Sequence, residues 1–245
     1  MSEPKVDAYD AEAAKCPLIR IGTDDKELRR RLFSVLRSSC KMTYEEFLDW
    51  ADEDTLAEWV DGEIVMTSPE SNLHQDISGF LETILRSFVH ANQLGIVRSA
   101  PFQMKLEHGR EPDLLFLARK HLSRLKETYL DGSADLVVEI MSPESVGRDR
   151  GEKFYEYSQG GVPEYWLIDP QMQWGEFYQL RETRYHLVFE GREGRYEALM
   201  LPGFWLKVEW LWQEPLPSPI AILAEIVGME PALSEAFEQA LRKEL

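Results

Sequence analysis

The sequence predicts an α/β domain, with a central mixed β-sheet flanked by helices, an N-terminal helical extension and a C-terminal helix. Three short apolar runs, at 113–117, 135–141 and 164–169, are typical of strands that are buried on both faces. The patterns at 70–89 and 147–159 instead repeat apolar residues at helical spacing. Strand patterns that alternate with helical patterns favour a sheet covered by helices.

The composition limits the kinds of partner that the chain can have. Its 245 residues suffice for one sizeable domain with appendages. A formal net charge of −17 disfavours non-specific attraction to phosphate. The charge is uneven, because residues 71–160 hold 13 acidic and 11 basic side chains, a net of −2. A polyanionic substrate is therefore disfavoured mainly at the flanks of the chain.

Targeting signals and cysteine chemistry are not evident in the sequence. No apolar run is long enough to cross a bilayer, and the N-terminus lacks the pattern of a signal peptide. Cys16 and Cys40 are too few for a disulfide framework and lack the neighbours of a zinc site. We therefore expect a cytoplasmic protein without membrane partners.

The chain is expected to divide into three parts. Residues 1–41 should form a loosely ordered arm and a helix at 24–38. The main domain should span 42–212. Residues 213–245 should form a proline-rich linker and one amphipathic helix at 220–245.

The elements of the main domain follow from local signals. A capping box at Thr43 and Glu46 predicts a first helix, which should end at about residue 52. Asp61-Gly62 joins two apolar segments and predicts a tight hairpin. A long helix then follows Ser68-Pro69. The later helix is expected at 147–159, and the later strands are expected at 96–99, 102–106, 112–117, 135–141, 164–169, 177–180, 186–189 and 196–200, with 205–212 closing the domain.

Glu139 is a carboxylate in the middle of an apolar strand. Strand side chains alternate, so Asp135, Val137, Glu139 and Met141 share one face, and the residues between them share the other. A carboxylate carried inward on such a strand requires a cation, a metal or a proton.

Asp113 lies at the mouth of another apolar strand, so its carboxylate and that of Glu139 can converge on one hard divalent cation. Such an ion supports phosphoryl chemistry, and a nearby ammonium would neutralise developing charge. Lys153 is the candidate ammonium. Asp149, Lys153 and Tyr157 follow at i, i+4 and i+8 and form one stripe of the predicted helix.

Several ordered motifs resemble the Uma family of restriction-endonuclease-like proteins, which belongs to the PD-(D/E)xK nuclease superfamily. The resemblance covers roughly residues 42–212. The motifs are Glu58-Trp-Val-Asp-Gly62-Glu63, Ser68-Pro69, His74, Pro112-Asp113, Val138-Glu139-Ile-Met-Ser-Pro, Asp149-x-x-x-Lys153-x-x-x-Tyr157 and Gly161-Val-Pro-Glu164-Tyr-Trp-Leu-Ile-Asp169-Pro170.

The resemblance implies a restriction-endonuclease-like fold and a Mg²⁺- or Mn²⁺-dependent endonuclease that hydrolyses DNA. It implies Asp113, Glu139 and Ile140 as the metal site and Lys153 as the catalytic lysine. The superfamily commonly has a lysine two positions after the strand carboxylate, where this chain has Met141. The resemblance therefore implies that the lysine has moved to the following helix.

Two further residues are implied by the resemblance alone. Glu58 and His74 would be additional metal-shell or acid–base groups.

Each candidate also has a purely structural interpretation. Asp113 after proline could be a turn or cap residue. Glu139 could form a buried ion pair with an arginine. Lys153 could pair with Asp149 on a solvated helix face, and His74 could be structural.

The alternative function is a catalytically silent nuclease fold that serves as a binding or assembly module. The acidic flanks motivate this alternative. The C-terminal amphipathic helix could pack on a second copy, which would make a homodimer, or on another protein.

Overall fold

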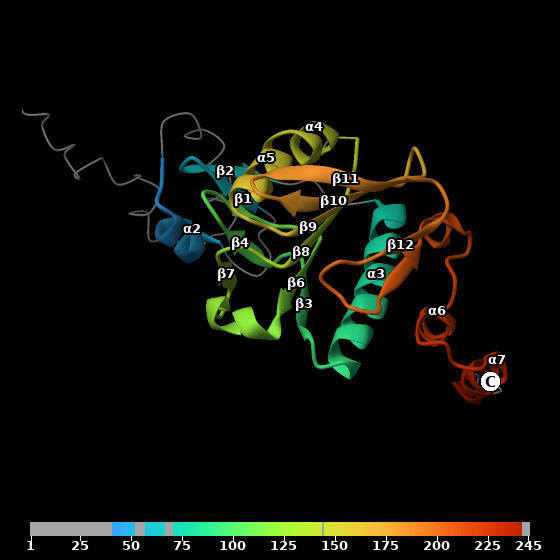
Figure 1. Cartoon of the computed structure of the whole chain (residues 1–245). Helices are drawn as coiled ribbons and strands as arrows, with labels where there is room; N and C mark the ends of the chain where they lie inside the picture. Colours follow the sequence, from blue (N-terminus) through green and yellow to red (C-terminus); the bar gives the residue numbers. More distant parts are fainter. Residues whose placement is uncertain (1–40, 52–56, 67–70, 144, 242–245) are drawn as a thin grey trace, which may run out of the picture. The chain divides into compact units, whose positions relative to one another are not determined.

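The computed structural model describes residues 41–51, 57–66, 71–143 and 145–241 (Figure 1). They belong to two compact units, unit 1 within residues 1–67 and unit 2 within 68–245, and each unit is described by itself. The helix predicted at 24–38 lies outside the described residues. The predicted boundaries at 41/42 and 212/213 stay predictions.

Unit 1 contains a short helix and a hairpin. Helix α2 (Tyr44–Trp50) begins at the predicted capping box, in which the Thr43 hydroxyl accepts from the Glu46 amide and the Glu46 carboxylate accepts from the Thr43 amide. Strands β1 (Ala57–Val60) and β2 (Glu63–Met66) pair antiparallel. The two turn residues between them both have positive φ, 51° and 83°, which explains why Asp-Gly is favoured there.

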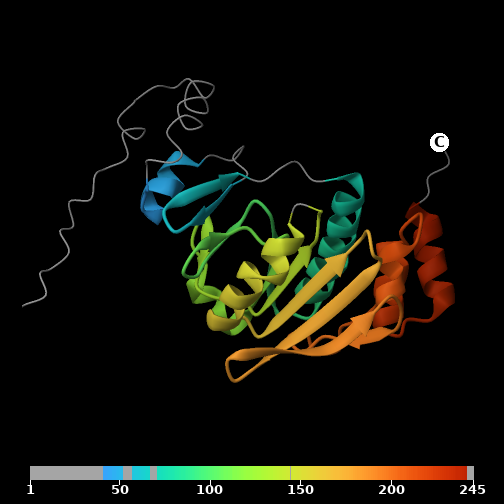
Figure 2. The same ribbon diagram turned by 90° about the horizontal axis from the view of Figure 1, so that it is seen from above.

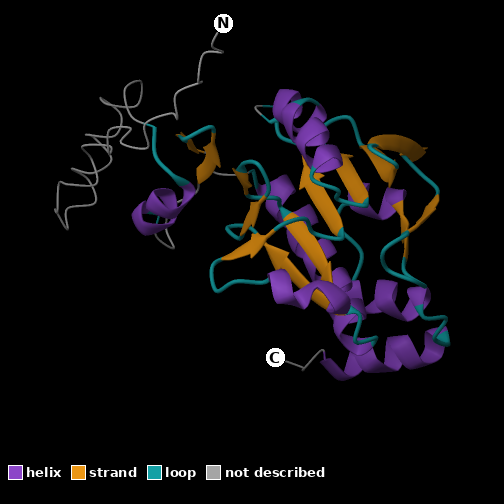
Figure 3. Ribbon diagram, turned by 60° about the vertical axis from the view of Figure 1, so that its left-hand side comes forward, coloured by secondary structure: helices purple, strands orange, loops and turns teal. Residues whose placement is uncertain are grey.

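Unit 2 is built on a six-stranded sheet in the order β11-β10-β9-β8-β6-β3. Strands β8 and β9 are parallel and the other neighbours are antiparallel, so the sheet is mixed. Helices lie against both of its sides (Figure 3). The strands are β3 (Gly95–Ser99), β6 (Leu114–Ala118), β8 (Leu136–Ile140), β9 (Glu164–Asp169), β10 (Trp174–Arg181) and β11 (Arg184–Gly191). The helices are α3 (Asn72–Ala91), α4 (Val146–Arg150), α5 (Glu152–Gln159), α6 (Pro219–Ile226) and α7 (Pro231–Leu241), with 3-10 helices η2 (Arg119–Arg124) and η3 (Val208–Trp212).

The two faces of the sheet have separate cores. Leu136, Val138 and Ile140 of β8 pack in the cluster that contains the apolar stripe of α3. Val137 and Met141 pack in the cluster on the α5 face. Helices α3 and α5 lie on opposite sides of the sheet in Figure 1. The alternation predicted for 135–141 is confirmed.

Smaller strands surround this sheet. In unit 2, β4 (Gln103–Lys105) pairs with β5 (Gly109–Arg110) and with β7 (Tyr129–Asp131). A separate pair joins β12 (Arg195–Glu197) to β13 (Trp205–Lys207). Strands β5 and β7 were absent from the sequence prediction.

Two helices predicted as continuous are each broken in two. The helix expected at 147–159 is interrupted at Gly151, which separates α4 from α5. A Cβ at Gly151 would lie 2.7 Å from the Gly147 carbonyl oxygen, so the close approach of the two backbones requires glycine. The helix expected at 220–245 is instead α6 and α7, separated around Gly228. Helix α6 packs beside α3 and α7 beside α6 (Figure 2).

The predicted class, α/β with a central mixed sheet flanked by helices, is confirmed. None of the helices among the described residues combines the length and the apolar character needed to cross a bilayer.

Candidate active site

The two strand carboxylates lie opposite one another in the sheet. Strands β6 and β8 pair antiparallel with Leu114 across from Val138. One further step of that register places Asp113 across from Glu139. Directly opposed residues of neighbouring strands project to the same face, and for these two it is the face covered by α5. The predicted convergence of the two carboxylates is therefore supported by the strand register.

Asp113 is held from two sides. Its Oδ2 accepts a hydrogen bond from the Ile140 amide at 2.6 Å and lies 3.2 Å from His74 Nε2. The carboxylate retains 16% exposure, whereas the His74 side chain retains 5%. His74 comes from the first turn of α3, where Ser71 caps the helix by accepting from the His74 amide. The side chain of Asp113 thus binds the backbone at the end of β8 through the Ile140 amide and remains partly exposed to solvent.

Glu139 is buried against α5. The Lys153 ammonium lies 3.1 Å from each Glu139 carboxylate oxygen, and the Tyr157 hydroxyl donates to Oε1 at 2.7 Å. The exposed fractions of the Glu139 and Lys153 side chains are 3% and 6%. The cation beside Glu139 is therefore a lysine rather than the arginine of the structural alternative. Lys153 also lies in the interior, rather than on a solvated helix face.

Asp149 is a further buried carboxylate next to this pair. Its Oδ1 lies 3.4 Å from Lys153 Nζ, and only 1% of the residue is exposed. Burial raises the pKa of Asp149 above its ordinary 3.8, and the opposing effect of the Lys153 charge is smaller. The sequence signal for Asp149 was the i, i+4, i+8 stripe, but the residue was not among the predicted site residues.

Tyrosine hydroxyls complete the polar surroundings. Tyr165 of β9 donates to the Asp149 backbone carbonyl at 3.1 Å, and burial, followed by the nearby Glu139 carboxylate, raises the pKa of Tyr165 well above 10.0. Trp166 donates to Glu164 at 2.8 Å. The side chains of Tyr157, Tyr165 and Trp166 are all buried, and their polar atoms all have partners.

A second ion pair fixes α5 over the sheet. Glu156, one turn along from Lys153, accepts from Arg110 Nε at 2.8 Å and from the His108 amide at 2.9 Å. The side chains of Arg110 and Glu156 are only 2% and 6% exposed. Because Lys153 and Glu156 share one short helix, this contact also restrains the backbone that carries Lys153.

The structure thus brings together Asp113, Glu139, Lys153 and His74 in unit 2, with the Ile140 amide hydrogen-bonded to Asp113. Glu58 lies in β1 of unit 1. Its position relative to the other four residues is outside what the structure describes.

The donor set fits a hard divalent cation. Mg²⁺ uses only one or two protein carboxylates and takes its other ligands from water and substrate. Within the described ranges, no group of three or more His, Cys, Asp or Glu side chains is arranged around a common metal position. Asp113 and Glu139 alone could therefore hold such an ion. The Lys153 ammonium lies within 3.4 Å of both Glu139 and Asp149, and the charge of Asp113 also acts on Asp149, so this excess of negative charge also favours a cation.

Comparison with known proteins identifies the family. The model of the Uma2 family, described as "Putative restriction endonuclease", matches residues 44–209. The chain belongs to the Uma2 family. The match covers all four site residues of unit 2 and Glu58, and it ends before α6. The predicted family is therefore confirmed.

A solved structure shares the fold of this Uma2 chain. It is described as a putative nuclease belonging to DUF820 from Anabaena variabilis, and it superimposes with a TM-score of 0.59 at 18% identity. The alignment covers 70% of this chain and 97% of the other. No curated protein matches the chain. At this identity the likeness shows a shared fold and leaves the chemistry to the residues of this chain.

Proposed function

We propose that this Uma2 protein is a Mg²⁺- or Mn²⁺-dependent endonuclease that hydrolyses phosphodiester bonds in DNA. The observation that carries the proposal is the opposed pair Asp113 and Glu139, with the Lys153 ammonium buried 3.1 Å from both oxygens of Glu139. A divalent cation held by Asp113 and Glu139 would supply Lewis-acid polarisation of the phosphoryl oxygen.

The residues of the chain would contribute binding and orientation. The Lys153 ammonium lies 3.1 Å from Glu139 and would stabilise negative charge that develops on the phosphoryl oxygens. Tyr157 holds Glu139 in place through its 2.7 Å hydrogen bond. His74 and the Ile140 amide hold one oxygen of Asp113. These contacts fix the carboxylates before substrate arrives, which is how preorganised sites lower barriers.

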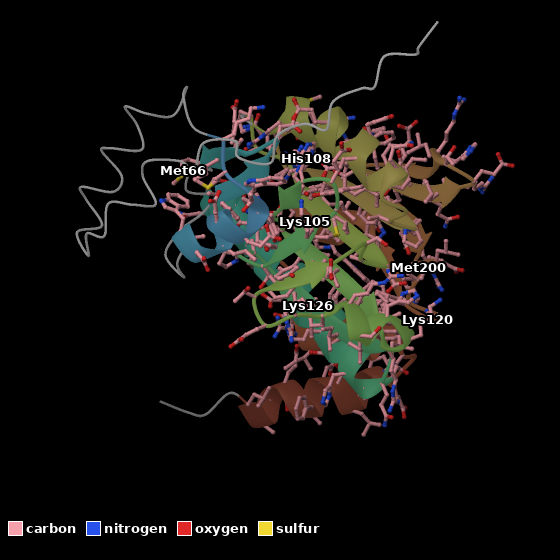
Figure 4. All side chains as sticks on the ribbon, turned by 90° about the vertical axis from the view of Figure 1, so that its left-hand side faces the viewer. Met66, Lys105, His108, Lys120, Lys126 and Met200 are labelled. Carbon is pink, nitrogen blue, oxygen red and sulfur yellow. The ribbon has the colours of Figure 1, made fainter. Side chains whose placement is uncertain are left out.

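DNA as the substrate is supported by the placement of basic residues. Residues 119–126 include four basic residues and no acidic one, in a chain whose net charge is −17. Figure 4 shows Lys105, Lys120 and Lys126 along one side of unit 2. Cations arranged along one side can follow a phosphate backbone.

The test is cleavage of supercoiled and linear DNA by the purified protein with Mg²⁺, Mn²⁺ or a chelator. The metal-dependent activity should be lost in D113N and E139Q, because each variant removes one carboxylate charge while keeping the shape of the side chain. E152Q is the matched control, because Glu152 lies on α5 next to Lys153 but is 69% exposed.

Cleavage that persists in E139Q would overturn this mechanism. Loss of activity in E152Q as well would mean that the general charge of α5 matters, rather than the two strand carboxylates.

The second candidate is the catalytically silent binding or assembly module, and exposed apolar residues favour it. A groove of about 610 Å³ lies between α3, α6 and α7. Val227, Met229, Leu233 and Phe237 line it and are between 46% and 61% exposed. Helices α6 and α7 also lie beyond the family match. Such a surface could pack on a second copy of the chain.

The oligomeric state tests this candidate. A dimer seen by sedimentation that dissociates in L233D, combined with no cleavage under any metal condition, would favour the assembly module. A monomeric wild type would remove the homodimer from consideration.

A further inference from the structure

A buried acceptor beside Lys153 calls for an explanation. Asp149 Oδ1 is enclosed and lies 3.4 Å from Lys153 Nζ, yet it receives no hydrogen bond within the part of the chain that the structure describes. The ammonium is nearer to Glu139, at 3.1 Å from each oxygen. Buried polar atoms are normally paired, so an acceptor at this distance from a buried ammonium has a role to be identified.

The position of Asp149 is fixed independently of Lys153. Tyr165 donates to its backbone carbonyl from β9, and the Asp149 amide donates to the Ser145 carbonyl at 2.9 Å. Lys153 lies beyond the Gly151 break, in the next helix. Asp149 and Glu139 therefore belong to different elements, and the ammonium lies within 3.4 Å of both.

A divalent cation and the Lys153 ammonium would compete for Glu139. Both are positive, and the ammonium occupies both carboxylate oxygens. For Glu139 to bind a cation, the ammonium must give up at least part of this contact. An ammonium that is 6% exposed then needs another anionic partner, because isolated buried charge is strongly unfavourable.

We propose that Asp149 is a positioning residue that receives the Lys153 ammonium when Glu139 binds a divalent cation. The ammonium shifts from the Glu139 oxygens to Asp149 Oδ1, stays in the site and remains available to the phosphate. The proposal rests on the cation site of the proposed function, and it assigns Asp149 a role through Lys153 rather than as a metal ligand.

The test is a double-mutant cycle on Mn²⁺ binding, measured by calorimetry without DNA. The four proteins are the wild type, D149N, K153Q and the double variant. D149N should weaken Mn²⁺ binding, because the displaced ammonium has lost the carboxylate charge that lies 3.4 Å from it. K153Q should tighten binding, because the competing ammonium is gone. The weakening caused by D149N should be about tenfold greater with Lys153 present than in the K153Q background, as for other residues in contact.

The cycle separates this role from the alternatives. If Asp149 were a ligand, or attracted the cation only through space, D149N would weaken binding equally in both backgrounds and the proposal would be overturned. E152Q, which removes an exposed charge from α5, should leave the Mn²⁺ dissociation constant within about twofold of the wild type.

Crystal structures of the wild type with and without Mn²⁺ provide a measurement that does not depend on the variants folding. With Mn²⁺ the Nζ to Oδ1 distance should shorten to about 2.8 Å. An ammonium that stays on both oxygens of Glu139 in the Mn²⁺ form would overturn the proposal. Coupled Mn²⁺ binding without DNA cleavage would overturn the proposed nuclease activity and support the role of Asp149. A wild type that binds no Mn²⁺ would overturn both.

Discussion

Replacing Tyr157 with phenylalanine isolates one buried hydrogen bond of the site. The substitution removes the hydroxyl that donates to Glu139 Oε1 at 2.7 Å and keeps the ring, which packs edge-to-face on Tyr165 with ring centroids 5.3 Å apart. Tyr157 is fully buried and Glu139 is 3% exposed, so little water is present to replace the lost donor.

The expected cost follows from the charge of the acceptor. Hydrogen bonds to charged groups contribute about 1.5–3 kcal/mol, and the contact here is short and shielded from solvent. The free energy of unfolding should fall by about that amount in Y157F. For a protein of this size, the melting temperature should fall by roughly 5 °C. The mobility gained by Glu139 should also lower the metal-dependent cleavage rate by about tenfold, as for other groups that orient a metal ligand.

The assay is urea unfolding followed by circular dichroism, with cleavage measured on the same preparations. Y155F is the matched control, because Tyr155 lies on the same helix and is 67% exposed. Its unfolding free energy should stay within about 0.5 kcal/mol of the wild type. A Y157F protein as stable as Y155F would refute the argument that this hydrogen bond contributes to holding Glu139.

Three further predictions concern other parts of unit 2. Glu164 is fully buried in β9, and burial raises its pKa above the ordinary 4.5 despite donors from Tyr196, Trp166 and the Met200 amide. The stability of the wild type relative to E164Q is therefore highest below about pH 4.5 and is lost as the pH rises through the folded-state pKa of Glu164. In urea titrations E164Q should gain stability relative to the wild type as the pH rises above about 4.5, and a difference that is constant with pH would contradict this. G151A should destabilise the protein by about 1–3 kcal/mol, because its Cβ would lie 2.7 Å from the Gly147 carbonyl oxygen. G147A, whose Cβ meets no atom within 4 Å, should stabilise the protein by about 0.5–1 kcal/mol. Equal effects of the two variants in thermal melts would argue against the close approach at Gly151. R110M should lower the free energy of unfolding by about 3–5 kcal/mol, because it removes the guanidinium beside the buried Glu156 carboxylate. K207M, at the half-exposed pair with Glu225, should lower it by less than about 1 kcal/mol. Similar losses of stability in both variants would contradict the argument from burial.

The sequence was most informative where strand periodicity and chemistry coincide. The alternation around Glu139 predicted both faces of β8, because a period of two leaves each side chain only two directions. The spacing of Asp149, Lys153 and Tyr157 predicted a common stripe, and all three lie near Glu139 in the structure despite the helix break. Strand position indicated Asp113 and helix spacing indicated Lys153, the resemblance implied the same two residues, and the structure brings both to the side of the sheet where Glu139 lies.

The remainder depended on contacts that local patterns do not encode. Apolar spacing continues across Gly151, so periodicity alone did not reveal the break, which arises from the approach of two backbones. Strand β5 has two residues and β7 has three, too few to show a period. Gly228 and Pro231 lie at the boundary between α6 and α7, but the apolar pattern continues across them. The pairing of Arg110 with Glu156 joins residues 46 positions apart and has no local signal.

The register of β8 carries chemical as well as structural information. Its five residues alternate between two faces of the sheet, with an apolar set on the α3 side and a second set on the side of Lys153. A shift of one residue in the register against β6 and β9 would place Glu139 in the apolar core on the α3 side and an aliphatic side chain beside Lys153. Deletion of one residue from this strand would therefore disrupt both the packing of the core and the placement of Glu139 beside Lys153. The strand register that gives the correct fold therefore also places the carboxylates of Asp113 and Glu139 on the same face of the sheet.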